Sequence, residues 1–402
     1  MKYLYLLLLA LLPTLAGAQT AVIDTTGGRY YRPVFASVTV ARDVAYGSAA
    51  TYDGTTQTLR LDVYQPAGDT VARRPLVIFA HGGGFVAGSK ADAYPVAFCT
   101  RLARLGYVVA SIEYRLGFAF SGLAQPADTP RIAAAAIRGG LDMKAAVRFF
   151  RRDAATTRTY RTYPNYVFVS GSSAGAFAAL GVGYLDKASE VPAYIDLAAL
   201  GGIEGNSGNP GYSSAVAGVI NLSGATQGPG IIEAGNAPLC SAHGTADATV
   251  PYLQGRVGSL LPPKYVYGSG RLNARATAVG IPNVLRRFSK AGHVPFETNA
   301  AYADTVFWTV RDFLRPLLRR GGVALAARPG AVAAAFQAYP VPAREALQLS
   351  FPAAASGEAE LLDAAGRVVR RFPPTAVLPR ENLPAGLYAV RFAGQVVRVI
   401  FQ

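Results

Sequence analysis

Charged residues and cysteines are scarce in this chain, and each scarcity excludes a class of protein. Charged residues make up only 16% of the 402 positions and hydrophobic residues 51%, a balance too apolar for a disordered chain. Two cysteines, Cys99 and Cys240, are too few for a disulfide scaffold, so we expect two buried thiols, with a single bridge as the alternative. The length predicts a large core and room for two domains.

Lysine is scarce as well, although the net charge is +15. Only six of the 39 basic residues are lysines, and the arginines are scattered along the chain, with clusters no longer than pairs such as Arg151-Arg152. A surface that follows nucleic-acid phosphates needs a longer basic stripe. We therefore predict no nucleic-acid partner.

The N-terminus has the pattern of a secretory signal. Lys2 precedes an apolar run from Tyr3 to Leu12, and residues 16–18 read AGA, the small-x-small pattern that signal peptidase accepts. A retained membrane anchor needs about 20 apolar residues, more than this segment has. We predict that residues 1–18 are cleaved, that no stable membrane span remains, and that the chain passes through the periplasm to be secreted or attached to the cell surface.

Apolar runs and amphipathic segments alternate up to residue 319, which predicts an α/β fold for residues 19–319. A hairpin is expected within 37–65, where hydrophobic positions alternate around a turn. Later runs are continuous, as in parallel strands buried on both faces. These strands are expected at 76–80, 107–112, 166–170, 216–222, 238–242 and 284–288. Helices are expected at 91–105, 131–153, 174–186 and 297–318.

The chain changes character after residue 319. Residues 320–338 are rich in small residues, glycine and proline, and are predicted to form a linker. Short runs separated by Pro, Asp and Gly then predict a small all-β sandwich in residues 339–402. Its strands are expected at 346–351, 358–363, 366–372, 387–393 and 395–401.

A candidate nucleophile lies at a predicted turn from strand to helix. Residues 171–175 read GSSAG and fit the pattern G-x-S-x-G, centred on Ser173. The flanking glycines allow the chain to reverse so sharply that the serine side chain projects from the edge of the sheet. The sequence therefore favours Ser173 as a nucleophile.

A second glycine motif, HGGGF at residues 81–85, follows the strand expected at 76–80. Its glycines can turn backbone N–H groups toward one point, where a negatively charged oxygen would be stabilised. We predict that the N–H groups of Gly83, Gly84 and Ala174 form an oxyanion hole. A flexible turn is the alternative.

A serine hydroxyl needs a base, usually a histidine held in one tautomer by a carboxylate. Of the three histidines, His81 belongs to the glycine turn and His243 begins the segment HGTAD, which leaves His293. We predict His293 as the base of Ser173 and Asp247, in a loop after a strand, as its orienting acid. The alternatives for the acid are Glu204, Asp304 and Glu297.

In this order, the motifs HGGGF, GSSAG, HGTAD and GH resemble the α/β-hydrolase superfamily, in particular carboxylesterases whose HGGG turn supplies the oxyanion hole. The resemblance covers about residues 37–319. It implies an eight-stranded, mostly parallel sheet, a nucleophile at Ser173 assisted by Asp247 and His293, and no metal or organic cofactor.

Residues 339–402 resemble the C-terminal sorting domain of the type IX secretion system. Residues 339–343 read YPVPA where that family usually has YPNPA, and residues 383–388 read LPAGLY, matching L-P-x-G-x-Y. The resemblance implies that the secretion machinery is a partner of this domain. An accessory β-sandwich, for example one that binds carbohydrate, is the alternative.

The sequence thus predicts an exported serine carboxylic ester hydrolase that works through an acyl-enzyme on small-molecule or polymer-linked esters, with esters on polysaccharides as one candidate. A serine peptidase of the prolyl-oligopeptidase type is the first alternative, but its relatives usually carry a large N-terminal propeller, and only about 57 residues lie between the predicted cleavage site and the strand at 76–80. A non-catalytic surface binding protein on a hydrolase scaffold is the second.

Overall fold

The computed structural model of the protein describes residues 23–118, 129–258, 264–319, 337–339, 343, 345–350, 357–373, 377–392 and 395–401. The chain divides into two compact units, 1–328 and 329–402, and each is considered by itself. The predicted signal segment and residues 320–336 of the predicted linker lie outside the described residues.

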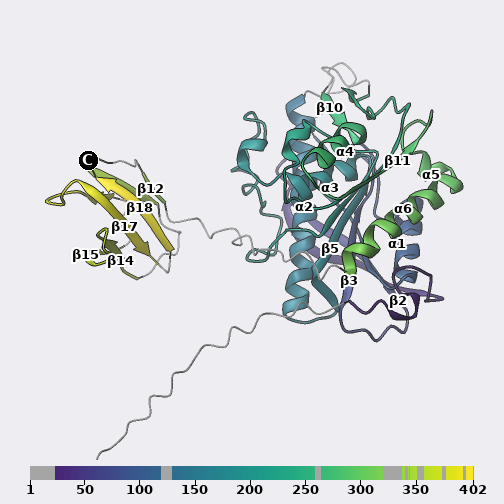
Figure 1. The fold of residues 1–402 in the computed structure, drawn as a ribbon, viewed down its shortest axis with the longest axis horizontal. Helices are drawn as coiled ribbons and strands as arrows, with labels where there is room; N and C mark the ends of the chain where they lie inside the picture. The colour runs from purple at the N-terminus through teal and green to yellow at the C-terminus, as the bar shows by residue number, and fades with distance from the viewer. Residues whose placement is uncertain are drawn as a thin grey trace, which may run out of the picture. The chain divides into compact units, whose positions relative to one another are not determined.

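The larger unit is built on an eight-stranded sheet in the order β1-β2-β4-β3-β5-β6-β8-β11. Strands β1 and β2 form the expected hairpin, β2 pairs antiparallel with β4, and the other neighbours are parallel. The predicted α/β fold with a mostly parallel sheet is confirmed (Figure 1). The strands are β1 Val38–Ala50, β2 Thr56–Pro66, β3 Arg74–Ala80, β4 Val108–Ile112, β5 Thr162–Ser172, β6 Gly218–Leu222, β8 Leu239–Gly244 and β11 Asn283–Phe288.

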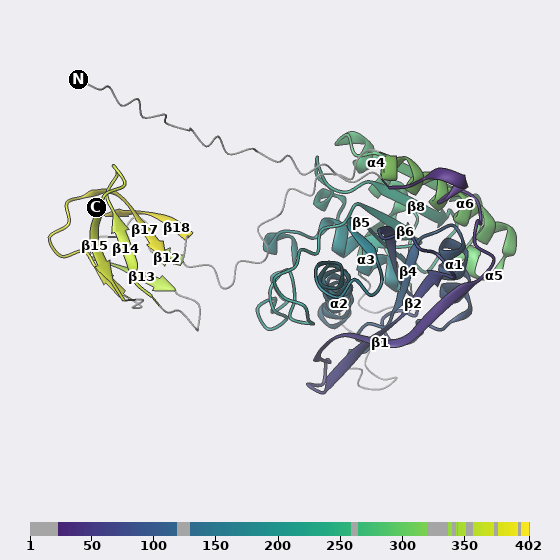
Figure 2. The ribbon, with the colours of Figure 1, turned by 90° about the horizontal axis from the view of Figure 1, so that it is seen from below.

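Helices cover both faces of this sheet, as Figures 1 and 2 show. In β3, Leu76 and Ile78 pack into one hydrophobic core while Val77 and Phe79 pack into the other, because successive side chains of a strand point to opposite faces. The first core holds side chains of α2 Thr129–Ala155, α3 Ala174–Tyr184 and α4 Ser269–Ala278, and the second those of α1 Ala93–Arg104 and α6 Ala300–Arg319. No helix in the described ranges is long and apolar enough to cross a membrane.

The prediction of a single helix over 297–318 is wrong. The segment is divided into α5 Pro295–Thr298 and α6, because Asn299 adopts an extended conformation and its side chain accepts a hydrogen bond from the N–H of Tyr302 at 3.2 Å. Asn299 therefore caps a new helix. Helix α4 and a small sheet were not predicted. This sheet contains β7 Ala225–Thr226, β10 Tyr265–Gly268 and β9 Gln254–Arg256, and short 3₁₀ turns cover Thr26–Gly28, Ala188–Glu190 and Pro229–Ile231.

The smaller unit is all-β. Leu347 from one sheet meets Leu361 and Val390 from the other in a common core, as the predicted sandwich requires. Its first strand begins at Gln337, so residues 337–338 are strand and not linker as predicted. The sheets are β12 Gln337–Tyr339, β13 Ala346–Ser350 and β16 Val377–Pro379, and β15 Val368–Phe372, β14 Ala359–Leu362, β17 Gly386–Phe392 and β18 Gln395–Phe401.

Both cysteines are free and buried, Cys99 in α1 and Cys240 in β8. The bridge left open by the sequence is not formed. Burial raises the pKa of the Cys240 thiol to about 12 and also raises the pKa of Cys99. Since the thiolate is the reactive form, neither group is a nucleophile at neutral pH.

Candidate active site

Ser173 lies on a sharp turn between β5 and α3. Its φ of +50° is uncommon for a residue with a side chain. A Cβ on Gly171 would lie 2.2 Å from the backbone of Gly175, and a Cβ on Gly175 would lie 2.1 Å from the carbonyl oxygen of Ala80. Gly171 is therefore required by close packing within the turn, and Gly175 by the packing of the turn against β3.

The structure brings the three predicted catalytic side chains together. The Oγ atom of Ser173 lies 2.8 Å from Nε2 of His293, and Nδ1 of His293 lies 2.7 Å from Oδ2 of Asp247. Asp247 follows β8 and His293 follows β11, so all three residues stand beyond the carboxyl ends of parallel strands. In this arrangement Nδ1–H donates to the carboxylate and Nε2 accepts from the serine hydroxyl, as a general base must.

The alternative acids are engaged elsewhere. Glu204 pairs with Arg148 at 3.3 Å, Asp304 pairs with Arg101 at 2.8 Å, and Glu297 accepts a hydrogen bond from the hydroxyl of Ser172. Burial raises the pKa of Glu297, so its carboxylate takes up a proton more readily than that of Asp247. The geometry thus favours Asp247 over the other three.

The carboxylate of Asp247 is buried and receives hydrogen bonds on both oxygens. Oδ1 accepts from the backbone N–H groups of Thr249 at 2.9 Å and Val250 at 2.8 Å, and Oδ2 also lies 3.2 Å from Nε2 of His243. Burial alone would raise the pKa of Asp247, but the contacts with His243 and His293 hold it well below its usual range. The acid therefore stays ionised throughout the neutral range.

His243 is a site residue that the sequence reasoning missed. Its Nδ1 lies 2.7 Å from Oγ of Ser269, and its Nε2 lies 2.9 Å from the carbonyl oxygen of Val250. The buried imidazole thus joins the loop of Asp247 to the start of α4. The sequence signal for His243 was its position near the end of the buried strand β8, four residues before Asp247.

The predicted oxyanion-hole residues lie in the glycine turn after β3 and at the start of α3. Gly83 has a φ of +109°, and a Cβ there would lie 2.0 Å from the carbonyl oxygen of Ala87, so only glycine fits. Gly84, Ser173 and Ala174 line the same cavity. Ala174 is the first residue of α3, where backbone N–H groups have no partner within the helix. The role of these N–H groups as donors remains a prediction.

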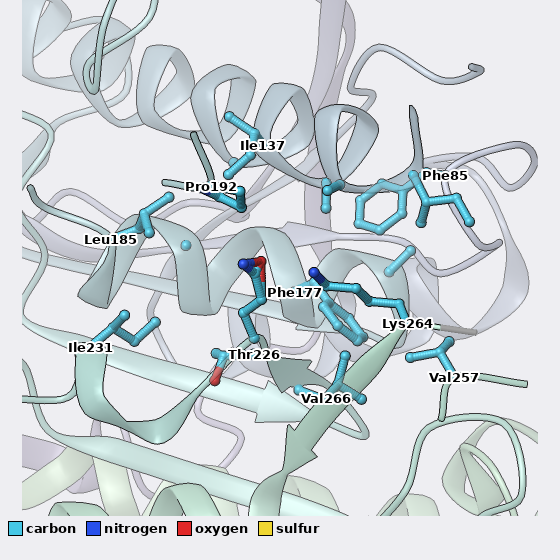
Figure 3. A pocket seen from close by; sticks show the side chains of 18 of the residues that line it. Phe85, Ile137, Phe177, Leu185, Pro192, Thr226, Ile231, Val257, Lys264 and Val266 are labelled. Carbon is cyan, nitrogen blue, oxygen red and sulfur yellow. The ribbon is translucent and has the colours of Figure 1, made fainter. Parts of the chain in front are cut away.

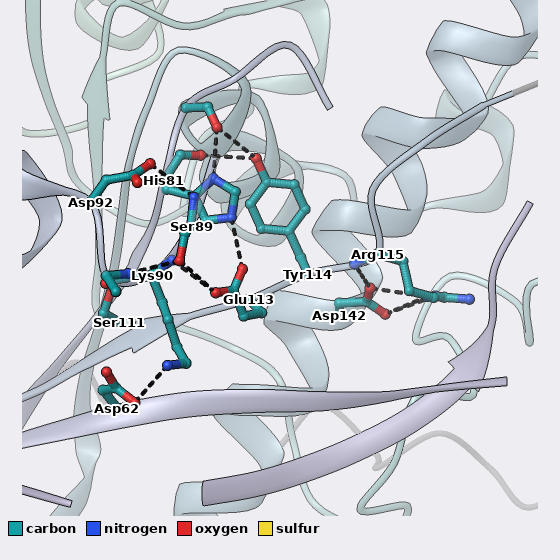
Figure 4. A network of polar contacts seen from close by, with 12 residues as sticks. Asp62, His81, Ser89, Lys90, Asp92, Ser111, Glu113, Tyr114, Arg115 and Asp142 are labelled. Carbon is teal, nitrogen blue, oxygen red and sulfur yellow. Dashed lines mark hydrogen bonds and ion pairs between the residues drawn. The ribbon is translucent and has the colours of Figure 1, made fainter. Parts of the chain in front are cut away.

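A network of polar contacts anchors the glycine turn to the end of β4 (Figure 4). The His81 ring is buried. Its Nδ1 lies 2.7 Å from the carbonyl oxygen of Gly82, and its Nε2 lies 3.2 Å from Oε2 of Glu113. The ring stacks on Tyr114, whose hydroxyl donates to the carbonyl oxygen of His81 at 2.9 Å. Glu113 also accepts hydrogen bonds from the hydroxyl of Ser89 and the N–H of Lys90, both at 3.0 Å.

We expect Glu113→Ala to lower kcat for an ester about tenfold to a hundredfold, with a smaller change in KM, because the turn carrying Gly83 and Gly84 loses its anchor. Burial alone would raise the pKa of Glu113, but hydrogen bonds from His81 and the N–H of Lys90 hold it below its ordinary value, so an ionised partner of His81 is lost. Steady-state kinetics measure the effect. Asp53→Ala, at an exposed carboxylate of the β1–β2 turn, is the control, and equal kcat values for the two variants would contradict the expectation.

A cavity of about 210 Å³ has Ser173 in its lining. Figure 3 shows part of this lining, with Phe85, Phe177 and Leu185 among the labelled side chains. Helices α2 and α3 line the cavity together with segments near residues 190–203, 225–231, 249–257 and 264–266. Within the residues that the structure covers, no cluster of three or more His, Cys, Asp or Glu side chains is arranged to hold a metal ion.

Residues 61–231 match the model of the BD-FAE family, a family of α/β-hydrolase esterases. The matched segment contains the glycine turn and Ser173 and ends before Asp247 and His293. No curated protein sequence matches the chain. The family match supports a hydrolytic esterase, a carboxylesterase.

Two solved structures illustrate what the chain is similar to. The apo form of Thermogutta terrifontis esterase 2 is 22% identical, with 69% of this chain and 94% of that chain covered and a TM-score of 0.49. A truncated carbohydrate esterase from gut microbiota is 18% identical, with 71% and 98% covered and a TM-score of 0.49.

Proposed function

We propose that this esterase is a secreted serine carboxylic ester hydrolase that forms an acyl-enzyme on Ser173. The observation that carries the proposal is the line of contacts from Asp247 through His293 to Ser173, with distances of 2.7 and 2.8 Å. A nucleophile, a base and an orienting acid within hydrogen-bond reach of one another are the parts that acyl transfer needs.

The first half of the reaction transfers the acyl group to the enzyme. His293 takes the proton of Ser173 through Nε2 while Oγ attacks the ester carbonyl carbon, and Asp247 stabilises the imidazolium that forms. The N–H groups of Gly83, Gly84 and Ala174 donate hydrogen bonds to the carbonyl oxygen as it becomes negatively charged. His293 then donates its proton to the leaving alcohol, and the acyl-serine remains.

The second half releases the acid. A water molecule replaces the alcohol, gives a proton to His293 and attacks the acyl-serine carbonyl carbon. The same N–H groups stabilise the second oxyanion, and its collapse returns the proton to Ser173 and frees the carboxylic acid. Water exclusion is not required in this half, because water is the second substrate.

We test the chemistry with a fluorophosphonate probe and intact-protein mass measurement. The wild-type chain should gain one phosphonyl group and hydrolyse 4-nitrophenyl acetate, whereas Ser173→Ala should do neither. Ser172→Ala is the matched control, because the hydroxyl of Ser172 donates a hydrogen bond to Glu297 and not to His293. A wild-type chain that neither reacts with the probe nor hydrolyses the ester would be a binding protein, and faster cleavage of a prolyl peptide amide than of the ester would favour the peptidase.

Export would bring the enzyme to esters outside the cell, and esters on polysaccharides are one candidate among them. The support for export comes from the signal-like residues 1–18 and the sorting-like residues 339–402. In a bacterium that has a type IX secretion system, the full chain should appear in the medium or on the cell surface. A chain that ends at residue 336 should stay in the periplasm, and equal export of both would refute this part of the proposal.

A further inference from the structure

The cavity at Ser173 follows one face of α3. Ala174, Phe177, Gly181 and Leu185 line it, and their spacing of three and four residues places them on a single side of the helix and its C-terminal cap. Figure 3 shows Phe85 and Leu185 at opposite ends of this lining. The cavity is therefore elongated and runs from the nucleophile to the far end of the helix.

The opposite wall comes from α2, again from one helix face. Ile132, Ala136 and Gly140 are spaced by four residues and line the cavity. The volume of about 210 Å³ is far more than the roughly 10–15 Å³ that a single water needs, and it holds on the order of ten carbon-sized groups. Further apolar side chains close the walls, namely Pro192, Ile203, Ile231 and Val266.

The charged groups of the lining have hydrogen-bond partners within the protein. The ammonium of Lys144 donates to the carbonyl oxygens of Leu185 at 3.2 Å and Ile203 at 2.6 Å. The carboxylate of Glu190 accepts from the backbone N–H of Lys187 at 2.9 Å, and Nζ of Lys264 donates to the hydroxyl of Tyr194 at 3.0 Å. The occupant that fits these walls is apolar.

Gly181 is the residue that the packing of the protein does not explain. Glycine inside a helix is destabilising relative to alanine. At Gly183, a Cβ would collide with Val219 at 2.2 Å, so glycine is needed there. At Gly181, by contrast, no heavy atom of the described chain outside its own helix backbone and its chain neighbours lies within 4 Å of a Cβ. The space left by its missing side chain belongs to the cavity.

We propose that the cavity binds the acyl half of the ester as an extended apolar chain of about eight to ten carbons, and that Gly181 leaves the room for its distal part. The proposal rests on the ester hydrolase function above. Gly181 is eight residues beyond Ser173, which is about 12 Å along the helix and roughly the upper end of the reach of an extended acyl chain of eight to ten carbons. A side chain at position 181 would thus meet the end of such a chain and leave an acetyl group untouched.

A series of 4-nitrophenyl esters from acetate to dodecanoate tests the proposal. Each methylene that becomes buried contributes up to about fourfold in kcat/KM, so the wild type should prefer octanoate to acetate by at least about tenfold. Gly181→Leu should lower kcat/KM for octanoate at least about tenfold more than kcat/KM for acetate and so lose the preference for octanoate, and Gly181→Ala should fall between. Ala301→Leu adds the same side chain at an exposed position of α6 and should keep the wild-type preference.

A second variant covers the case in which leucine at position 181 prevents folding, which the melting temperature reports. Leu185→Ala enlarges the far end of the cavity and should move the preferred chain length upward by two or more carbons. A wild type without preference for octanoate, an equal loss on both esters in a folded Gly181→Leu variant, or a tenfold preference for a feruloyl ester over octanoate would each overturn the proposal. These results leave the reaction with the fluorophosphonate probe intact, so they are distinguishable from failure of the proposed function.

Discussion

Ser173→Ala should lower kcat for 4-nitrophenyl acetate by about 10⁶-fold, because the variant has no oxygen that can accept the acyl group. His293 lies 2.8 Å from this oxygen, and Asp247 lies 2.7 Å from His293. Both act on the reaction only through the serine oxygen, so they no longer promote it once that oxygen is removed. The residual rate, about 10³–10⁴-fold above that in water, would come from the oxyanion hole and the cavity. Single-turnover and steady-state hydrolysis of the ester measure both quantities.

The comparison with Ser172→Ala makes this test specific. Ser172 is the last residue of β5, and its hydroxyl donates to Glu297, so its loss changes a packing contact and leaves the base in place. We expect kcat within about tenfold of the wild type for this variant, since a displaced neighbour costs far less than a missing nucleophile. If Ser173→Ala kept a tenth of the wild-type kcat, or if Ser172→Ala lost more of it than Ser173→Ala, the nucleophile would be another group.

The buried strands were predictable because the sheet leaves a plain pattern in the sequence. All seven residues of β3 are buried, and five of them form the continuous apolar run at 76–80. Helix α4 was not predictable in the same way, because only a few of its side chains are buried, among them Leu272 and Ala276, and the rest of SGRLNARATA is small or polar. The break at Asn299 had a signal that was not used, since asparagine is a preferred helix cap.

The meeting of the three predicted catalytic residues was predictable because parallel strands end at one edge of the sheet. Ser173, Asp247 and His293 each follow a strand, so residues far apart in the sequence had to come together there. The same logic could have found Glu113, which follows β4 next to the strand that ends before His81. The cavity was beyond such reasoning, because its walls come from helix faces and from long connections whose paths the sequence does not specify.

Asp247→Asn should lower kcat by about 10⁴-fold at neutral pH with only a small change in KM. When the NH₂ group of the asparagine faces the imidazoles, Nδ1 of His293 must accept a hydrogen bond, so the proton moves to Nε2, which then cannot accept from Ser173. The kinetics of ester hydrolysis measure the loss. Asp304→Asn, which neutralises an exposed carboxylate paired with Arg101, should stay within about twofold, and a larger loss there than at Asp247 would reverse the assignment of the acid.

The same substitution should also change the dependence of stability on pH. The folded-state pKa of Asp247 is depressed because His243 and His293 outweigh the effect of burial, so its ionisation stabilises the fold above its ordinary value of 3.8. This contribution is lost as the pH falls from 3.8 through the lower folded-state pKa. The wild type should therefore have a higher melting temperature than Asp247→Asn at pH 7, and the difference should shrink toward pH 3. A constant difference would contradict the depressed pKa.

The four donors around Asp247 explain why an asparagine of the same size cannot replace it. A carboxylate has about four acceptor positions, and here Oδ1 faces the N–H groups of Thr249 and Val250 while Oδ2 faces His243 and His293. An amide has one oxygen, so its NH₂ group must face either the two backbone donors or the two imidazoles. In the first orientation the loop that carries residue 247 loses its hydrogen bonds, and in the second the imidazole of His293 is held in the wrong tautomer. Both orientations oppose catalysis, and a loss of less than about tenfold would show that the carboxylate is not the orienting acid.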